Sequence, residues 1–381
     1  MSAPAAAPVW FCTNVGGGIF GAGQTVAWRK LGLDARLHFA VDLADYWRAK
    51  SGLATRLRLR WAMYASYPWQ LWRAVRRAAP GEMFVAVTNP FFLPALASRA
   101  ARRSGARVIH LVYDLYPDAL VFGGGWSSGH PAARFAARTT RLAIADCAAT
   151  VYLGERLRRH AEARYGVAAR TRVISVGTDT TVFAGAEPGP RAGRLVRCLY
   201  SGHMGKLHDW ATLAGALREG MPPDVAVEIA ADGPGAIALK DGLAAQAAQQ
   251  PDRLHFAGTR GNAEWREAML AADVALVTMR HGAEKVVMPS KTYSAMAAGQ
   301  AVLAVCPVES DLADLINEHD CGWVVEPGDV AGLQRLLSAL PDLAAEVRRK
   351  RCNAWKAAHA FYSMEAVGKQ WLELLHSLHV H

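Results

Sequence analysis

Hydrophobic and polar positions alternate in blocks along this chain. Short apolar runs of strand length are each followed by a longer segment with helical spacing of apolar residues. Buried strands are predicted at residues 9–13, 83–88, 107–112 and 150–153 in the first half. In the second half they are predicted at 196–200, 225–230, 253–256, 274–278, 301–305 and 323–325. Strands that alternate with helices predict an α/β protein with parallel sheets.

The helical segments and one irregular segment predict two domains. Helices are expected at 19–31, 94–104, 132–145 and 364–378. Residues 184–193 are rich in Gly and Pro without periodicity, as is typical of a linker. A chain of 381 residues also exceeds what one core usually supports. The predicted division is a first domain at 1–185, a linker at 186–194, a second domain at 195–358, and a C-terminal helix within 359–381.

Composition places the chain among ordinary globular proteins. Hydrophobic residues make up 52% and charged residues 20%. No apolar run reaches the roughly 18 residues of a membrane-spanning helix, and the first residues lack the basic start of a secretory signal. The six cysteines are scattered, without a C-x-x-C pair or a metal-like spacing. We therefore expect reduced thiols and a cytoplasmic protein without a bound metal.

The formal net charge of +10 is unevenly distributed. No acidic residue occurs between Asp45 and Glu82, where arginines are interleaved with Trp and Tyr. This mixture suits the headgroup layer of an anionic membrane, so we expect peripheral attachment to the inner face of the plasma membrane. The residues expected to carry it are Trp69, Trp72, Arg73, Arg76 and Arg77. A solvated basic helix is the alternative; nucleic acid is disfavoured, because no nucleic-acid-binding module is recognisable.

The segment 289–302 reads PSKTYSAMAAGQAV and predicts a loop that enters a helix, which Gly299 ends before a buried strand. Ser290 and Lys291 lie in the opening turn, where unpaired amide groups favour an anion. A lysine adds a positive charge suited to phosphate. The alternative is an ordinary helix-to-strand connection.

Two glycine-rich loops follow predicted first strands. Gly16, Gly17 and Gly18 follow the strand at 9–13 and allow close backbone approach to a phosphate or sugar. They do not fit a dinucleotide-binding fingerprint, so a nicotinamide-dependent oxidoreductase is a weak alternative, beside a plain flexible loop. Lys206 follows Gly202 in the second domain and is placed to pair with phosphates as a leaving group gains charge.

A third loop carries two carboxylates. Residues 110–118 read HLVYDLYPD, so a buried strand delivers Asp114 and Asp118 near its carboxyl end. Either carboxylate can accept a proton from an acceptor hydroxyl or orient that hydroxyl. A turn or capping aspartate is the alternative, more so for Asp118.

Together these segments resemble the GT-B glycosyltransferases of family 4. Residues 289–305 resemble the donor-site helix of that family, and further similar segments follow the family's order at 199–206, 231–235, 255–258 with 272–274, and 321–329. Residues 110–118 are similar to a signature of family 4 enzymes that build bacterial surface polysaccharides. The resemblance in the donor half covers roughly residues 170–365.

The resemblance implies two Rossmann-like doubly wound domains that face a cleft, with the last helix crossing back to the first domain. It implies sugar transfer, with retention of configuration, from a nucleotide diphosphate-sugar to a lipid-linked or glycan acceptor. No further cofactor, metal or protein nucleophile is expected. The implied catalytic residues are Asp114, Asp118, Lys206 and Glu284. The implied donor-binding residues are Gly16, Gly17, Gly18, Gly202, Lys206, Gly233, Thr259, Arg260, Ser290, Lys291 and Ser294.

The chain departs from the family pattern at three places. Ser294 occupies the position of a family glutamate expected to hold the donor ribose, and Glu284 is two residues out of register with the other donor-site glutamate. Of a family P-N-G-x-D turn, only Gly177 and Asp179 remain. The alternatives left open are an enzyme with a soluble acceptor, and a catalytically degenerate homologue that acts as a partner subunit.

Overall fold

The computed structural model describes residues 7–17, 19–48, 52–185, 187–189 and 193–379. The chain divides into two compact units. Unit 1 comprises Met1–Val121, Gly125–Val176 and Met364–His381, and unit 2 comprises Phe122–Gly124 and Gly177–Ser363. The chain thus enters unit 2 at Gly177, earlier than the linker predicted from composition, and residues 186 and 190–192 of that linker lie outside the described residues.

Unit 1 contains a six-stranded parallel sheet in the order β2-β1-β3-β4-β5-β6. Its strands are β1 (Val9–Gly16), β2 (Ala35–Asp42), β3 (Met83–Val87), β4 (Arg107–Val112), β5 (Ala149–Tyr152) and β6 (Thr171–Val173). Because β2 lies on one side of β1 and β3 on the other, the direction of winding reverses at β1. Ligands of doubly wound sheets bind beyond the carboxyl ends of strands at such a reversal.

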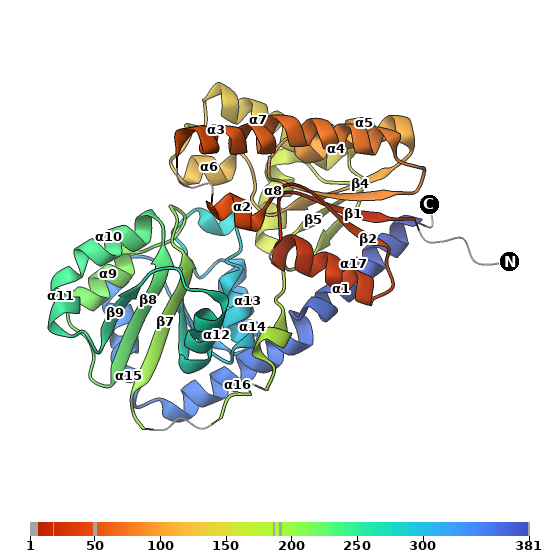
Figure 1. Cartoon of the computed structure of the whole chain (residues 1–381). Helices are drawn as coiled ribbons and strands as arrows, with labels where there is room; N and C mark the ends of the chain where they lie inside the picture. The colour runs from red at the N-terminus through yellow and green to blue at the C-terminus, as the bar shows by residue number, and fades with distance from the viewer. Residues whose placement is uncertain (1–6, 18, 49–51, 186, 190–192, 380–381) are drawn as a thin grey trace. The chain divides into compact units, whose positions relative to one another are not determined.

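Helices cover both faces of this sheet (Figure 1). The helices of this part of the chain are η1 (Ile19–Gly23), α1 (Gln24–Lys30), α2 (Leu43–Arg48), α3 (Leu53–Trp61), η2 (Ala62–Ser66), α4 (Tyr67–Arg77), α5 (Leu93–Ser104), α6 (Asp118–Phe122), α7 (Pro131–Asp146), α8 (Glu155–Tyr165) and α17 (Met364–His379). On one face, Tyr67 and Leu71 of α4 pack with Phe84 of β3 in a buried cluster.

The C-terminal helix α17 returns to unit 1, as the resemblance implied. Its buried Trp371 packs against Trp28 of α1 with ring centroids 5.3 Å apart, and Trp28 in turn contacts Phe11 of β1. Arg170 also donates a hydrogen bond of 2.6 Å to the carbonyl of Ser377. Helix α17 therefore completes the core on this face of the first sheet.

Unit 2 contains a second six-stranded parallel sheet, in the order β12-β11-β10-β7-β8-β9. Its strands are β7 (Val196–His203), β8 (Val225–Asp232), β9 (Leu254–Ala257), β10 (Val274–Thr278), β11 (Ala301–Val305) and β12 (Gly322–Val325). Its helices are η3 (Thr180–Phe183), α9 (Ala211–Arg218), α10 (Pro234–Gly242), α11 (Ala244–Gln249), α12 (Asn262–Ala271), η4 (Ala283–Lys285), α13 (Lys291–Ala297), α14 (Asp311–Glu318), α15 (Val330–Ala339) and α16 (Ala344–Phe361).

This second sheet is centred on its first strand, β7, where the winding reverses between β8 and β10. Strands β10 and β11 are buried along their whole length, which explains their uninterrupted apolar sequences. The predicted fold class, two doubly wound α/β domains with a returning C-terminal helix, is confirmed.

Two strands, β2 and β6, were not predicted from the pattern of apolar residues; both lie at edges of the first sheet. Strand β2 reads ARLHFAVD and is largely half-exposed, while β6 has only three residues. Edge strands bury little surface, so their sequences lack the apolar run on which the prediction depended. The predicted helix at 19–31 begins as the π-helical turn η1 and continues as α1.

Candidate functional site

The two loops that leave the reversal point of unit 2 are joined by hydrogen bonds. Arg280, just after β10, donates its backbone N–H to the carbonyl of Leu207 at 3.0 Å, and its guanidinium to the carbonyl of Lys206 at 3.4 Å. Residues 204–210 follow β7, the neighbouring strand. The predicted donor loop and the loop after β10 thus form one continuous edge.

Lys291 is the central cation of this edge. Its Nζ donates hydrogen bonds to the Tyr200 hydroxyl at 2.6 Å and to the His203 carbonyl at 3.2 Å, and lies 4.0 Å from the centre of the Tyr200 ring. Desolvation by the surrounding protein lowers the pKa of Lys291 to about 7, although the Asp232 carboxylate acts in the opposite direction. A phosphate at this ammonium would restore its charge.

A half-buried histidine and a buried tyrosine support Lys291. His208 Nδ1 lies 2.7 Å from the carbonyl of Thr278 and 3.3 Å from the Tyr200 hydroxyl. Burial, with the nearby Lys291 charge, lowers the pKa of His208 to about 3, so this imidazole is neutral at physiological pH. Its Nδ1–H donates to Thr278, the last residue of β10, and this contact fixes the loop after β7 to the neighbouring strand.

The carboxyl ends of β7 and β8 are joined by a side-chain hydrogen bond and by backbone hydrogen bonds of the loops that follow them. His203 Nδ1 lies 2.7 Å from the Asp232 carboxylate. Met204 donates its N–H to the carbonyl of Asp232 at 2.8 Å, and Gly235 donates to the carbonyl of Met204 at 3.0 Å. Gly233 has φ +99°, and a Cβ there would lie 2.7 Å from the His203 ring, so only glycine fits.

Lys206 is exposed, and no hydrogen-bond or ion-pair partner of its side chain occurs among the described residues. Within the same described chain, the backbone N–H groups of Gly205, Lys206 and Leu207 have no acceptor. Gly202, at the end of β7, has φ +108° and turns the chain into this loop. Free N–H groups and two lysines at one sheet edge are chemically suited to bind an anion such as a diphosphate.

Glu284, which was predicted to be catalytic, and the predicted donor residues Ser290 and Ser294 lie in the segment from η4 to α13. Glu284 is in η4 with one carboxylate oxygen 3.8 Å from Lys285 Nζ; its other oxygen is buried without a hydrogen-bond partner in the described chain. Ser290 immediately precedes α13 and makes no side-chain cap. Ser294 exchanges a hydrogen bond of 3.1 Å with Thr178, so this hydroxyl ties α13 to the segment entering unit 2.

Two residues predicted at the donor site lie farther along the sheet. Thr259 and Arg260 follow β9, which is separated from β7 by β8. Arg260 forms an ion pair with Glu228 of β8. This pairing gives Arg260 a structural partner, and the structure does not bring these two residues to the reversal point.

In unit 1, Asp114 lies just beyond β4, beside the end of β3. Burial raises the pKa of Asp114 to about 6. The backbone N–H groups of Tyr113 and Asp114 donate to the Thr88 hydroxyl at 3.2 and 3.3 Å. A carboxylate with a pKa near the working pH is suited to accept a proton.

Asp118 is committed to structure. Its buried carboxylate accepts hydrogen bonds of 2.8 Å from Tyr165 and lies 2.8 Å from His160 Nε2, with Arg164 at 3.2 Å. All these partners belong to α8, so Asp118 joins the start of α6 to that helix. Because both oxygens are occupied, these contacts favour the structural alternative for Asp118 over the predicted catalytic role.

The glycine loop of unit 1 is only partly described. Gly16 ends β1, and a Cβ there would lie 2.5 Å from the Phe39 ring. Gly17 has φ +87°, while Gly18 lies outside the described residues. Beside this loop, buried Asn14 donates from its amide to Asn89 Oδ1 at 2.9 Å, which links the ends of β1 and β3.

Sequence reasoning missed several residues of the edge in unit 2, namely Tyr200, His203, His208, Asp232 and Arg280. In unit 1 it missed Asn14, Thr88 and Asn89. A signal was present for all but His208: each of the others lies at the end of a predicted strand or within three residues of it, where polar side chains interrupt apolar runs. Their partners, however, come from neighbouring strands distant in sequence.

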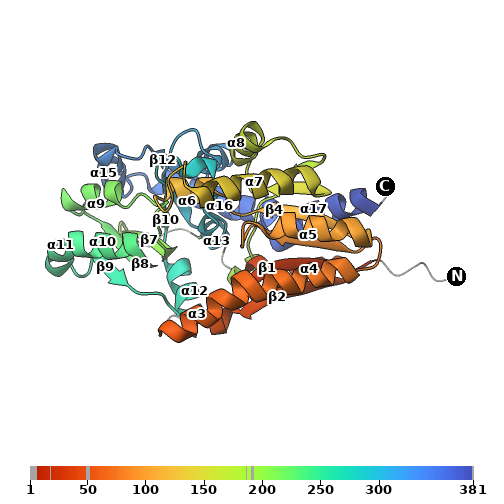
Figure 2. The same ribbon diagram turned by 90° about the horizontal axis from the view of Figure 1, so that it is seen from above.

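The predicted membrane residues lie on α4, next to α3. Trp69 is 56% exposed and stacks on Trp72 with ring centroids 5.0 Å apart, and the Arg76 guanidinium lies 4.9 Å from the centre of the Trp72 ring. Helices α3 and α4 lie nearly end to end through η2 (Figure 2). None of the residues of α3 is buried, and Leu53, Leu57, Trp61 and Tyr64 form an exposed apolar row.

No helix among the described residues is long and apolar enough to cross a bilayer.

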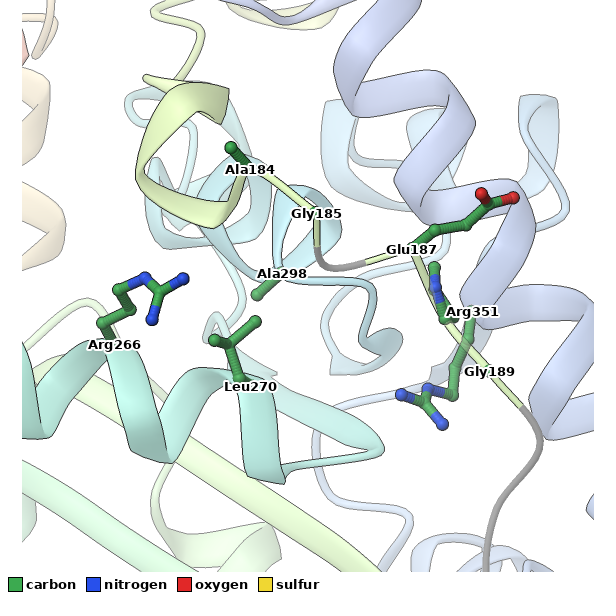
Figure 3. A pocket seen from close by; sticks show the side chains of 9 residues that line it. Ala184, Gly185, Glu187, Gly189, Arg266, Leu270, Ala298 and Arg351 are labelled. Carbon is green, nitrogen blue, oxygen red and sulfur yellow. The ribbon is translucent and has the colours of Figure 1, made fainter.

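A cavity of about 330 Å³ lies elsewhere in unit 2, between the segment 184–189 and helices α12 and α16. Figure 3 shows Arg266 and Arg351 on opposite sides of it, with Leu270 and Ala298 between them. Both arginines already have protein partners: Arg266 donates to Val182, and Arg351 to Gly299 and Asp273. None of the predicted site residues lines this cavity.

Comparison with known proteins agrees with the geometry of unit 2. Residues 193–342 match the family model for Glycosyl transferases group 1. The matched region contains β7, the loop with Lys206, and Lys291. "Probable glycosyltransferase WbjE" from Pseudomonas aeruginosa is 26% identical over 278 residues, which are 70% of this chain and 68% of that protein. Glycosyltransferase activity is thereby supported.

The fold is also that of solved GT-B glycosyltransferases. Sucrose-phosphate synthase from Thermosynechococcus elongatus superimposes with a TM-score of 0.73 and 16% identity, covering 98% of this chain and 99% of that one. Anabaena HepE, solved in complex with UDP, gives a TM-score of 0.69 and 14% identity over 97% of this chain and 100% of that one. At these identities the likeness concerns the fold.

Proposed function

We propose that this protein is a glycosyltransferase that moves a sugar from a nucleoside diphosphate-sugar to a lipid-linked or glycan acceptor. The observation that carries the proposal is the set of free N–H groups in the same edge of unit 2 as Lys206 and Lys291, at the reversal point of the sheet. It lies within the region that matches the group 1 glycosyl transferases. The complex of HepE with UDP supports a nucleoside diphosphate as the ligand class.

The proposed chemistry depends on the leaving diphosphate. Its negative charge increases as the bond to the sugar breaks, and preorganised cations and N–H groups stabilise that charge without reorganisation. Lys206 and Lys291 supply the positive charge in place of a metal. The family resemblance further suggests front-face attack with retention, in which the leaving phosphate helps to take the acceptor proton.

Asp114 is the proposed acceptor-side residue. Its raised pKa of about 6 leaves it ionised but basic near neutral pH. It follows β4 at the carboxyl edge of the first sheet, where doubly wound folds bind ligands. A place in surface polysaccharide synthesis is suggested by the resemblance of residues 110–118.

We also propose that the α3–α4 surface attaches the enzyme to anionic membranes from the cytoplasmic side. Beside the apolar row Leu53, Leu57, Trp61 and Tyr64, the arginines of these helices are exposed, and no acidic residue interrupts the segment. Each surface cation contributes about 1 kcal/mol at an anionic bilayer. This arrangement suits an acceptor that is itself lipid-linked.

A catalytically degenerate partner subunit is the second candidate. The observation that favours it is the Ser294–Thr178 hydrogen bond, because a hydroxyl engaged in this way is a poor substitute for a ribose-binding carboxylate. The presence of Lys206, Lys291 and Asp114 favours the first candidate, an active glycosyltransferase.

A thermal-shift titration tests the proposal, with UDP, GDP, ADP, dTDP and NAD added to the wild type and to Lys206→Ala. A ligand at a hundredfold excess over its Kd stabilises by about 2.7 kcal/mol. We expect one nucleoside diphosphate to stabilise the wild type, with little effect on the variant. If no diphosphate stabilises the wild type, the degenerate homologue is favoured. Stabilisation by NAD alone would overturn the proposal.

A further inference from the structure

The imidazole of His203 occupies a slot between two glycines. A Cβ on Gly205 would lie 3.1 Å from His203 Nε2, and one on Gly233 would lie 2.7 Å from His203 Cε1. Any larger residue at Gly233 would also lie against the carbonyl of Met204. The loops after β7 and β8 are therefore shaped around this ring.

One ring nitrogen of His203 has a hydrogen-bond partner, and the other has none among the described residues. His203 Nδ1 lies 2.7 Å from the Asp232 carboxylate. No partner for Nε2 is present in the described part of the chain, and the side chain remains 64% exposed. The free N–H groups of Gly205, Lys206 and Leu207 follow in the same loop, so Nε2 opens beside the anion site.

We propose that His203 is a further ligand of the donor's diphosphate group, and that Asp232 is its positioning residue. The inference rests on the proposed function, because it assigns a contact within that donor site. The carboxylate fixes the orientation of the ring, which leaves Nε2–H of the imidazolium to donate to a phosphate oxygen. Such a charge-assisted hydrogen bond is stronger than one between neutral groups.

The charged groups around His203 favour this arrangement when a diphosphate is bound. Asp232 from β8 accepts a hydrogen bond from the ring on one side, and a phosphate oxygen would accept one on the other. Lys291 from α13 contacts the His203 carbonyl at 3.2 Å, and the neutral His208 lies behind Tyr200. A bound diphosphate would lie beside both His203 and Lys291.

Calorimetry with UDP and uridine as probes tests the role of His203. We expect His203→Ala to weaken UDP binding roughly tenfold and to leave uridine binding unchanged. His203→Arg, which restores a cationic donor, should recover most of the affinity. The matched control is His255→Ala, an exposed histidine of β9 away from the reversal point.

Unchanged UDP binding in His203→Ala, or an equal loss for UDP and uridine, would overturn the assignment. If the wild type prefers GDP, ADP or dTDP, that diphosphate and its nucleoside replace UDP and uridine as probes. A wild type that binds none of the four overturns the proposed function, whereas binding that is insensitive to His203 overturns this inference alone.

A double-mutant cycle tests the positioning role of Asp232. Asp232→Asn should weaken UDP binding several-fold when His203 is present, but not in the His203→Ala background, because the two residues act as a unit. An equal effect in both backgrounds would show that Asp232 acts independently of His203 and would refute its positioning role. Thermal midpoints without ligand identify any variant that loses the fold.

Discussion

At the residue scale, burial separates groups that hold the structure from groups that are poised to react. Asp118 is buried with both carboxylate oxygens occupied, and His208 is half-buried and neutral. Lys291 and Asp114, by contrast, lie at strand ends with pKa values moved toward neutrality, to about 7 and about 6. Perturbed pKa values at a sheet edge are typical of functional sites.

The lowered pKa of Lys291 predicts a pH dependence of donor binding. A lysine is charged below its pKa, so the free protein loses this charge as the pH rises above about 7. Binding of the preferred nucleoside diphosphate should weaken between pH 7 and pH 9, by up to about tenfold per pH unit. In Lys291→Arg the charge persists, and the dependence measured by calorimetry should flatten. A wild type with pH-independent affinity over this range contradicts the prediction.

Asp114→Asn should depress kcat more than donor affinity, because the residue belongs to the acceptor side. A carboxylate with a pKa of about 6 is ionised above that pH, so wild-type kcat should rise as the pH passes through 6. Initial rates across pH 5–8 and calorimetric donor binding check both statements. Donor binding that weakens while kcat holds would remove Asp114 from the acceptor side.

At the element scale, the loop after β8 depends on the absence of a side chain at Gly233. Gly233→Ala introduces a Cβ at φ +99°, 2.8 Å from the Met204 carbonyl and 2.7 Å from the His203 ring. We expect a loss of stability of about 1–3 kcal/mol and weaker diphosphate binding. Gly258→Ala is the matched control, since nothing lies within 4 Å of a Cβ there. Equal effects of the two substitutions in urea unfolding would count against the prediction.

The exposed row on α3 predicts vesicle binding. Leu57→Glu with Trp61→Glu should release the protein from vesicles that contain phosphatidylserine, because two apolar anchors become anionic at a negatively charged surface. Val167→Glu, at another exposed apolar residue of unit 1, serves as control in the same sedimentation experiment. Unaltered sedimentation of the double variant would favour the solvated basic helix.

At the scale of the whole chain, the last helix belongs to the first unit. Trp371→Ala removes a ring that is 2% exposed and packed on Trp28, so we expect a loss of about 3–5 kcal/mol in the unfolding of unit 1. Trp61→Ala removes an exposed ring of the same size and should cost less than about 0.5 kcal/mol. Urea unfolding followed by far-ultraviolet circular dichroism checks the difference, and similar midpoints would show that α17 is dispensable.

Much of this organisation could be predicted from local sequence. The buried strands β4, β10 and β11 have the predicted bounds, because central parallel strands are apolar on both faces. The edge strands β2 and β6 were missed for the opposite reason. Within the candidate site, Lys206 and Lys291 were found from glycine loops and a helix start, whereas Arg260 was placed there and instead pairs with Glu228.

The sequence by itself determined the alternation of strands and helices and the positions of the two lysines, because these depend on periodicity and on short motifs. The return of the C-terminal helix to the first unit was implied by the family resemblance alone. Only the tertiary structure decided which side chains work together. His203 of β7 meets Asp232 of β8, and Tyr200 of β7 meets Lys291 of α13, although the partners are 29 and 91 residues apart in sequence. Strand order determines such contacts, and the order β10-β7-β8 arises from the winding of the whole sheet, which no local pattern encodes.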